Sequence, residues 1–223
     1  MSSLSPYEVF TDVSSDPLVR GFLRHPTGTA QDSLVLTHGA GGNARSSLLV
    51  ALAEEFAKNG FTVLRCDLPF RQDRTFGPPR PGNAARDREG LRNAVRAMRR
   101  IVPGKAFLGG QSYGGRQASM LCAEDPSVAD GLLLLSYPLH PPGKPEQLRT
   151  QHLPNLRNPV LVVQGTHDPF GSIPEIQSAM KLIPAKMSLL PVDGAGHDLG
   201  FKGKSRREEL PPRVVEEFRK LLL

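Results

Sequence analysis

The pentapeptide Gly110-Gln111-Ser112-Tyr113-Gly114 has the form G-x-S-x-G and lies between an apolar run and a helical pattern. A sharp turn from a strand into a helix pushes its serine outward as a nucleophile, and it tolerates only very small residues two positions away. The helix that follows also directs backbone N–H groups and the positive end of its dipole at the serine. The alternative is that Ser112 only caps the helix. The pattern and its position favour the nucleophile.

A serine hydroxyl is a poor nucleophile without a base, and two later segments offer the missing groups. Asp168 follows the apolar run 159–164, and His197 lies in a glycine-rich segment after the last predicted strand. The chain order serine, acid, histidine is the one that accompanies a G-x-S-x-G turn. We therefore predict that His197 takes the proton of Ser112 and that Asp168 orients the imidazole and stabilises its charged form.

Each of these residues has a structural alternative. Asp168 can cap the turn before Pro169, and His197 can bond to a neighbouring aspartate. His167 is a second histidine near the acid, but adjacent residues rarely face each other as a base and its orienting acid must. His38 is expected to pack the turn after its strand and to bond to the backbone. The triad of Ser112, Asp168 and His197 remains the favoured interpretation.

An acyl-transfer site also needs an oxyanion hole, and two segments can supply its donors. One donor is the N–H of Tyr113, the residue after the nucleophile. The other is expected from the glycine-rich loop 37–43, which follows an early strand. Ala40 is the preferred donor in that loop and Gly41 the next choice.

Strand-like and helix-like segments alternate along the chain, which indicates an α/β fold with a mostly parallel sheet. The irregular stretches 69–82 and 139–158 follow strands on the side of the sheet where such folds place their ligand crevice. Residues 7–24 are expected to add one or two antiparallel edge strands. We expect strands at 33–37, 61–68, 106–109, 131–137, 159–164 and 186–191, and helices at 46–59, 83–102, 113–123, from about 174, and at the C-terminus.

The chain resembles the α/β-hydrolase superfamily, and within it the small lidless members related to dienelactone hydrolase. The resemblance extends from Ser33 to about Lys204 and is carried by LVLTHGAGGN, DLPFR with a following RPG, GGQSYGGR, QGTHDPFG and GAGHDLGFK. It implies an eight-stranded sheet flanked by helices and hydrolysis through an acyl-enzyme. Dienelactone hydrolases proper carry a cysteine nucleophile where this chain has Ser112. The expected fold is a single α/β-hydrolase domain over residues 1–223, with a mostly parallel sheet, helices on both faces and no lid domain.

Composition excludes several other classes of protein. The 223 residues are 39% hydrophobic and 22% charged, which is ordinary for a globular domain and not for a disordered chain or a coiled coil. No apolar run approaches the roughly 18 residues of a membrane span, and the first residues have no signal-peptide pattern. Cys66 and Cys122 lie in apolar segments and are expected to be buried free thiols of a reducing, cytoplasmic protein.

The net charge of +6 raises the question of acidic partners, and much of the excess lies in residues 71–100. Five of these arginines are expected to form a solvated helix face rather than a nucleic-acid patch, because no aromatic residues interleave them to stack bases. They are Arg88, Arg92, Arg96, Arg99 and Arg100.

Three residues are candidates for substrate binding. Arg71, in the same loop as Arg74 and Arg80, and Arg116, one turn into the nucleophile helix, are each placed to hold a substrate carboxylate. Phe170 is expected to line the pocket. The histidine spacing suggests no metal site, and no cofactor is implied.

Together these features predict a serine hydrolase that cleaves a carboxylic ester, or a related acyl bond, of a small soluble substrate. A thioesterase, a peptidase or an acyltransferase would use the same groups, and a non-catalytic interaction module on a hydrolase fold is a further alternative. A monomer or a homodimer that engages a small acyl compound, and neither nucleic acid nor membrane, is expected.

Overall fold

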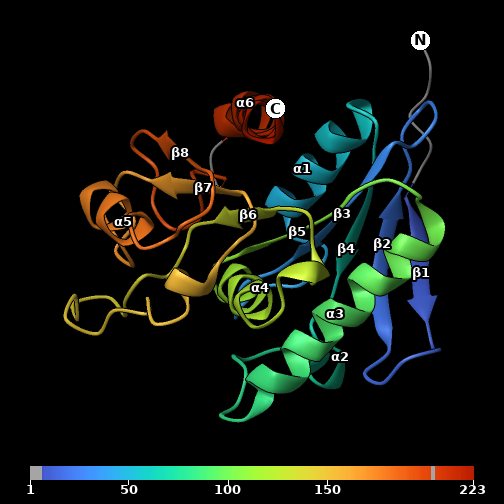
Figure 1. Ribbon diagram of the computed structural model, residues 1–223, viewed down its shortest axis with the longest axis horizontal. Coiled ribbons are helices and arrows are strands. Elements are labelled where there is room, and N and C mark those ends of the chain that lie inside the picture. The colour runs from blue at the N-terminus through green and yellow to red at the C-terminus, as the bar shows by residue number, and fades with distance from the viewer. Residues whose placement is uncertain (1–6, 202–203) are drawn as a thin grey trace.

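Eight strands form one sheet in the order β1-β2-β4-β3-β5-β6-β7-β8. The computed structural model describes residues 7–201 and 204–223, coloured along the chain in Figure 1. The β1–β2 and β2–β4 pairs are antiparallel, and all other pairs are parallel. The strands are β1 (Glu8–Asp12), β2 (Val19–Arg24), β3 (Asp32–Thr37), β4 (Phe61–Cys66), β5 (Ala106–Gln111), β6 (Leu132–Leu135), β7 (Val160–Gly165) and β8 (Met187–Val192).

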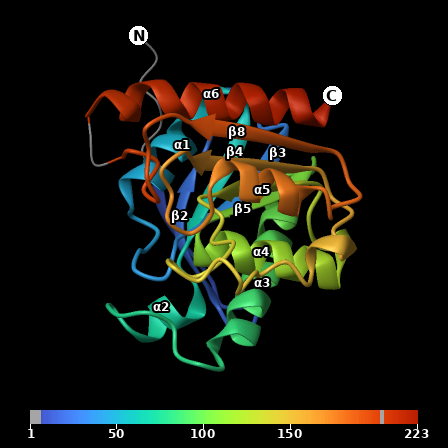
Figure 2. The ribbon, with the colours of Figure 1, turned by 90° about the vertical axis from the view of Figure 1, so that its left-hand side faces the viewer.

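Helices cover both faces of the sheet, as the two perpendicular views in Figures 1 and 2 show. Helices α1 (Ser47–Lys58) and α6 (Lys204–Leu222) lie on one face. Helices α3 (Asn83–Ile101), α4 (Tyr113–Glu124) and α5 (Ile173–Met180) lie on the other. A short helix, α2 (Pro69–Asp73), follows β4. The predicted α/β architecture, with helices on both faces of a mostly parallel sheet, is confirmed.

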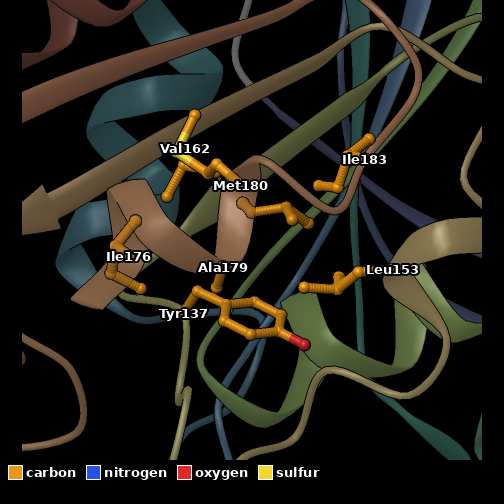
Figure 3. A pocket seen from close by; sticks show the side chains of 8 residues that line it. Tyr137, Leu153, Val162, Ile176, Ala179, Met180 and Ile183 are labelled. Atoms are coloured by element: carbon orange, nitrogen blue, oxygen red, sulfur yellow. The ribbon is translucent and has the colours of Figure 1, made fainter. Parts of the chain in front are cut away.

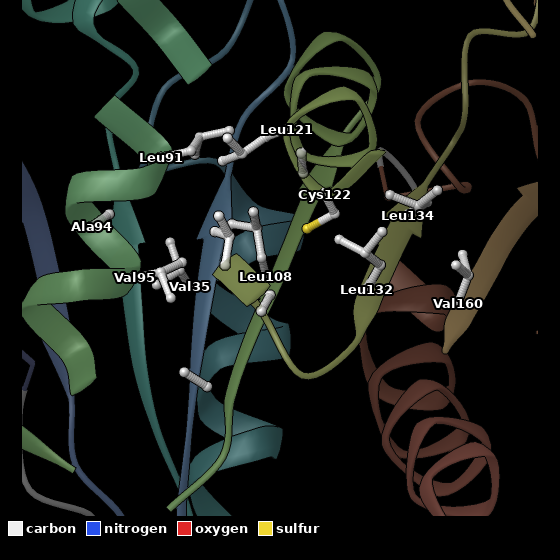
Figure 4. Close-up of a cluster of buried hydrophobic side chains, with 14 of the residues drawn as sticks. Val35, Leu91, Ala94, Val95, Leu108, Leu121, Cys122, Leu132, Leu134 and Val160 are labelled. Carbon is white, nitrogen blue, oxygen red and sulfur yellow. The ribbon is translucent and has the colours of Figure 1, made fainter. Parts of the chain in front are cut away.

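The central strands are apolar on both faces because each face carries a helical layer. Along β3, Val35 belongs to the cluster under α3 and α4, whereas Leu34 and Leu36 belong to the cluster under α1 and α6. Figure 4 shows the first cluster, in which Leu91 of α3 and Leu121 of α4 lie with side chains of the strands. Continuous apolar runs in the sequence thus correspond to strands that are buried from both sides.

The strand and helix predictions agree with the structure except at the ends of some elements and at two helices, α2 and α6. The edge strands expected in residues 7–24 are present as β1 and β2. The stretch 69–82, expected to be irregular, begins with α2, whose Pro69 occupies the first helical turn. Helix α6 begins at Lys204 and continues through Pro211 and Pro212, which would ordinarily end a helix.

The order of the strands determines where the loops meet. From β3 the chain passes to β4 on one side and then to β5 on the other, so the loops after β3 and β5 diverge at the carboxyl edge of the sheet. Open α/β sheets bind their ligands at such a point. The loop 37–43 follows β3 and Ser112 follows β5, so both lie at this point of the sheet edge.

Candidate active site

Ser112 occupies a strained turn between β5 and α4. Its φ of 51° and ψ of −116° lie outside the regions that non-glycine residues favour. A Cβ on Gly110 would lie 2.7 Å from the backbone of Gly114 and Gly115, and a Cβ on Gly114 would lie 2.4 Å from the carbonyl oxygen of His38. These contacts explain why glycine flanks the serine on both sides. The tight turn directs the Ser112 side chain out of the sheet.

The structure brings Ser112, Asp168 and His197 together although they come from three different loops. His197 Nε2 lies 2.8 Å from Ser112 Oγ, and His197 Nδ1 lies 2.8 Å from Asp168 Oδ2 and 3.0 Å from Oδ1. With a carboxylate on Nδ1, this nitrogen carries the proton, so Nε2 is free to accept the hydrogen of the serine hydroxyl. The contact runs without a break from hydroxyl to imidazole to carboxylate.

The Asp168 carboxylate is buried and fully engaged in hydrogen bonds. Besides the contact to His197, Oδ1 accepts from the Phe170 N–H at 2.9 Å and Oδ2 accepts from Gln164 Nε2 at 3.0 Å. Gln164 is completely buried; its carbonyl oxygen accepts from the Tyr137 N–H, and Nε2 also donates to Gly171 O. Sequence reasoning did not assign Gln164 a role. The signal available was a single amide in the otherwise apolar run of β7.

Phe170 lies against the candidate base. Its ring stacks on the imidazole of His197 with centroids 4.2 Å apart and planes 30° from parallel. Phe170 was predicted to line the pocket, and in the structure its ring packs directly against His197. The stacked ring restrains the rotation of the imidazole about its side-chain bonds.

The loop after β3 is held in place by a buried histidine. His38 Nδ1 donates to Gly39 O at 2.8 Å, and Nε2 accepts from the Leu68 N–H at 3.2 Å, so the ring is the neutral Nδ1–H tautomer. Burial lowers the pKa of His38, in keeping with this neutral form. The structural role expected for His38 is confirmed.

Two backbone N–H groups are candidates for the oxyanion hole. The Tyr113 N–H is the first of α4 and has no carbonyl partner within the helix. Gly39 O accepts from the Gly42 N–H, so the N–H of Ala40, on the opposite side of the same planar peptide, points away from that contact. A Cβ on Gly39 would lie 3.3 Å from Ser112 Cβ, which places this peptide beside the nucleophile, whereas a Cβ on Gly41 would meet open space.

Arg71 does not have the free guanidinium that a substrate anchor needs. Its Nη2 donates to Ala40 O and Gly77 O, both at 2.9 Å, and its Nη1 donates to Arg74 O at 3.2 Å. The side chain is buried and lies over the ring of Phe70. These contacts contradict the expectation that Arg71 holds a substrate carboxylate. Arg71 instead ties the candidate oxyanion loop to the loop after β4.

A buried carboxylate supports the residue after the nucleophile. Asp87 Oδ2 accepts from the Tyr113 hydroxyl at 2.7 Å, and its Oδ1 accepts from the Phe70 N–H at 3.0 Å. Burial raises the pKa of Asp87, although both hydrogen bonds act in the opposite direction. The rings of Phe70 and Tyr113 also meet edge to face. Sequence reasoning did not identify Asp87, because a lone acid among helix arginines looks like a surface residue.

Several other candidates lie outside the site. His167 is exposed and does not contact Ser112. The helix arginines of α3 form ion pairs, mostly with acids of neighbouring elements: Arg88 with Glu124, Arg92 with Asp125 and Glu89, Arg96 with Glu89, Arg99 with Asp130, and Arg100 with Asp12. Cys66 and Cys122 are buried and unpaired, as predicted.

Two kinds of feature are absent from residues 7–201 and 204–223. No group of three or more His, Cys, Asp or Glu side chains there is arranged to hold a metal ion. No helix in the same part of the chain has the length and apolar character needed to cross a membrane.

A comparison with known protein families identifies the family of this chain. A family model described as an alpha/beta hydrolase domain matches residues 30–217. The chain belongs to the α/β-hydrolase family. The match spans β3 to α6 and so includes every loop that contributes to the site.

Solved α/β-hydrolase structures superpose on nearly the whole chain. Dienelactone hydrolase from Anabaena variabilis has a TM-score of 0.77 at 20% identity, over 97% of this chain and 98% of that one. A lidless α/β serine hydrolase from Xanthomonas campestris has a TM-score of 0.73 at 16% identity, over 98% and 97%. Est1E from Butyrivibrio proteoclasticus, solved with ferulic acid bound, has a TM-score of 0.75 at 15% identity, over 98% and 99%. At these identities the likeness concerns the hydrolase fold.

Proposed function

We propose that this α/β hydrolase is a serine esterase that cleaves carboxylic esters of small, soluble substrates through an acyl-enzyme. One observation carries the proposal. Ser112 Oγ, the His197 ring and the Asp168 carboxylate form an unbroken series of contacts of 2.8 Å at the carboxyl edge of the sheet. Contacts of this length suit proton transfer from the hydroxyl as it attacks.

In acylation, Ser112 Oγ attacks the ester carbonyl while its proton passes to His197 Nε2. The Asp168 carboxylate stabilises the imidazolium that forms, and it keeps the ring in the tautomer that the attack needs. When the tetrahedral intermediate collapses, the bond to the alkoxy group breaks, and His197 returns the proton to that leaving oxygen. The acyl group stays on Ser112 as an ester.

In deacylation, water takes the place of the departed alcohol. His197 accepts a proton from the water as its oxygen attacks the acyl carbonyl, and the bond to Ser112 Oγ then breaks. The proton on His197 returns to the serine oxygen. The products are the carboxylic acid and the free enzyme, and no other reactant is required.

In both steps a negative charge develops on the carbonyl oxygen of the substrate. The N–H groups of Tyr113 and Ala40 are the donors that we assign to this oxygen, and the N-terminal end of α4 adds its positive dipole. Both donors are backbone groups held by buried contacts, Tyr113 through Asp87 and Ala40 through Arg71. Such donors need little reorganisation during the reaction.

The preference for small, soluble substrates is supported by the loops around the crevice. The connections from β4 to α3 and from β6 to β7 contain only α2 and a short 3-10 helix, Leu153–Asn155, and neither is long enough for a lid domain. With connections this short, we expect the rate of ester hydrolysis to rise smoothly with substrate concentration, without activation at a lipid surface. The similarity to a lidless serine hydrolase and to dienelactone hydrolase supports the same substrate size.

Hydrolysis of a series of 4-nitrophenyl esters from acetate to octanoate tests this proposal. The wild-type protein is expected to release nitrophenol with a preference for short acyl chains, and Ser112→Ala is expected to lose at least about a thousandfold in kcat. Retention of the full rate by Ser112→Ala would overturn the assignment of the nucleophile.

A further inference from the structure

Arg116 lies one helical turn after Ser112 and next to the candidate site. Its backbone N–H donates to Ser112 O at 2.9 Å. Side chains of a helix lean toward its N-terminus, so the guanidinium of Arg116 extends back over the turn that contains Ser112 and Tyr113. In keeping with this direction, burial and Asp87 raise the pKa of the Tyr113 phenol, and the positive charge of Arg116 partly offsets this rise.

The guanidinium of Arg116 has no protein partner. Its Nε is buried and makes no hydrogen bond, and no ion pair or hydrogen bond of its other nitrogens occurs in the part of the chain that the structure describes. The Nε of Arg71 is also buried without a hydrogen bond, but the other nitrogens of Arg71 donate to three carbonyl groups, and Arg92 pairs with Asp125. A buried, unpaired guanidinium N–H is costly unless a ligand accepts from it.

A second arginine approaches from the loop after β6. Arg149 Nη1 donates to Pro138 O at 3.1 Å, and its backbone N–H donates to Leu139 O at 2.8 Å. Because β6 is the neighbour of β5 in the sheet, this loop begins beside Ser112: the Ser112 N–H donates to Leu135 O at 2.8 Å. Arg149 has no carboxylate within ion-pair distance among the described residues. Burial lowers the pKa of Arg149, and the positive charge of Arg116 lowers it further.

A network of buried polar groups links the two arginines. Ser119 Oγ donates to Arg116 O at 2.9 Å and lies 2.8 Å from His152 Nε2, from which it accepts. The Tyr137 hydroxyl donates to Arg149 O at 3.0 Å and lies 3.4 Å from the same nitrogen of His152.

The network adds no charge to compensate the arginines. Burial, Arg116 and Arg88 together lower the pKa of His152 to about 4, so its ring is neutral at physiological pH. In Figure 3 the Tyr137 ring lies along an apolar cavity beneath α5, and its hydroxyl is turned away from Val162 and Ile176. The carbonyl group of Arg149 and the ring of His152 thus lie at the hydroxyl end of this tyrosine.

Two cations that one buried network links, and that have no carboxylate partner among residues 7–201 and 204–223, predict an anionic ligand. A carboxylate would relieve the repulsion and match the planar fork of donors that a guanidinium presents. We propose that Arg116 and Arg149 form a subsite for a carboxylate that the substrate carries at a distance from the scissile ester. This inference rests on the proposed esterase function and specifies its substrate class as carboxylate-bearing acyl compounds.

A binding experiment tests the subsite independently of turnover. The Ser112→Ala protein is titrated with monomethyl adipate, which has one ester and one carboxylate, and with dimethyl adipate, which matches it in shape without the charge. Dissociation constants are measured by nuclear magnetic resonance. The monomethyl ester is expected to bind at least about tenfold more tightly, and the preference should weaken as sodium chloride is added.

Variants in the Ser112→Ala background identify the groups responsible. Arg116→Gln and Arg149→Gln are each expected to abolish most of the preference, and Arg116→Lys, which keeps the charge without the fork, to restore only part of it. Arg96→Gln is the matched control, because it removes one exposed positive charge from α3 far from the nucleophile turn. The thermal midpoint of each variant is measured to establish that it is folded.

The outcomes separate this inference from the proposed function. Equal binding of the two esters, no binding of the monomethyl ester, persistence of the preference in either glutamine variant, or its loss in Arg96→Gln would each overturn the subsite. Failure of the esterase assignment would instead appear in the wild-type protein, as no hydrolysis of any 4-nitrophenyl ester.

Discussion

Gln164 Nε2 donates to Asp168 Oδ2 at 3.0 Å beneath the loops of the candidate site, and both side chains are buried. The same amide accepts from the Tyr137 N–H through its carbonyl oxygen, so it bridges the loop after β6 and the loop after β7. Asp168 in turn holds His197. The position of the imidazole over Ser112 therefore depends on a glutamine that touches neither the base nor the nucleophile.

Replacement of Gln164 by leucine is expected to impair the site while keeping side-chain volume nearly constant. The Asp168 carboxylate and the Tyr137 N–H would each lose a partner, which should cost about 1–3 kcal/mol of stability. A displaced acid should also lower kcat by about 10- to 100-fold. Ester hydrolysis and urea unfolding measure the two effects, with the exposed Gln151→Leu as the control. Full activity in a destabilised Gln164→Leu protein would remove Gln164 from the positioning of the triad.

Arg71 provides a test that distinguishes positioning from substrate binding. Because its guanidinium donates to Ala40 O, Arg71→Lys should loosen the oxyanion loop and lower kcat by roughly tenfold, with little change in KM. Steady-state kinetics on a 4-nitrophenyl ester gives both parameters, and Arg96→Lys, the same exchange at an exposed position, is the control. A raised KM with unchanged kcat would instead support the substrate-binding role expected from the sequence.

The Tyr113–Asp87 contact predicts a pH-dependent change in stability. Burial raises the pKa of Asp87, so its ionised form destabilises the folded protein at neutral pH, and this cost disappears as the pH falls through the folded-state pKa. The Tyr113 hydroxyl offsets part of the cost. Tyr113→Phe should raise the pKa of Asp87 further and lower the free energy of unfolding by about 1–2 kcal/mol at neutral pH.

The loss in Tyr113→Phe should shrink as the pH falls through the raised folded-state pKa of Asp87, because the carboxyl group then becomes protonated in the folded protein. Urea unfolding over this pH range measures it, with Tyr7→Phe at an exposed position as the control. A difference that is constant with pH would mean that the hydroxyl does not stabilise a charged Asp87.

The glycines around the nucleophile predict a steric effect. In Gly114→Ala, the new methyl group would lie 2.4 Å from His38 O, a backbone atom that cannot move aside without shifting the oxyanion loop. The substitution should cost at least about 2 kcal/mol of stability. Gly28→Ala is the control, because a Cβ there meets nothing within 4 Å. Equal thermal midpoints for the two variants would contradict the close packing of this turn.

Much of the fold was predictable because the strands and the glycine-flanked serine carry local signals. The runs around Leu34 and Leu133 are apolar throughout, as strands covered on both faces must be. The N-terminal part of α6 was not predictable in this way, because Pro211 and Pro212 normally end a helix. Its packing on the sheet through Leu210 and Val214 depends on distant residues.

The residues of the candidate site also differ in whether a local sequence signal identifies them. The placement of Ser112, Asp168 and His197 followed from the order of motifs at strand ends. The different roles of Arg71 and Arg116 could not be predicted in this way, because the sequence places both arginines in segments expected near the candidate site. Only the structure distinguishes the guanidinium of Arg71, which donates to three carbonyl groups, from that of Arg116, for which the described residues supply no partner. Asp87 was missed because its partners, Tyr113 and Phe70, are far away along the chain. Gln164 was missed because its only signal was one amide in an apolar strand.

The central claim is that Ser112 is a nucleophile activated by His197 and Asp168, and covalent labelling tests it most directly. The protein is treated with a fluorophosphonate probe, digested, and analysed by mass spectrometry. We predict one label per chain, on Ser112, with labelling strongly slowed in His197→Ala and in Asp168→Asn. Absence of the label, a label on another residue, or an unchanged rate in both variants would contradict the account.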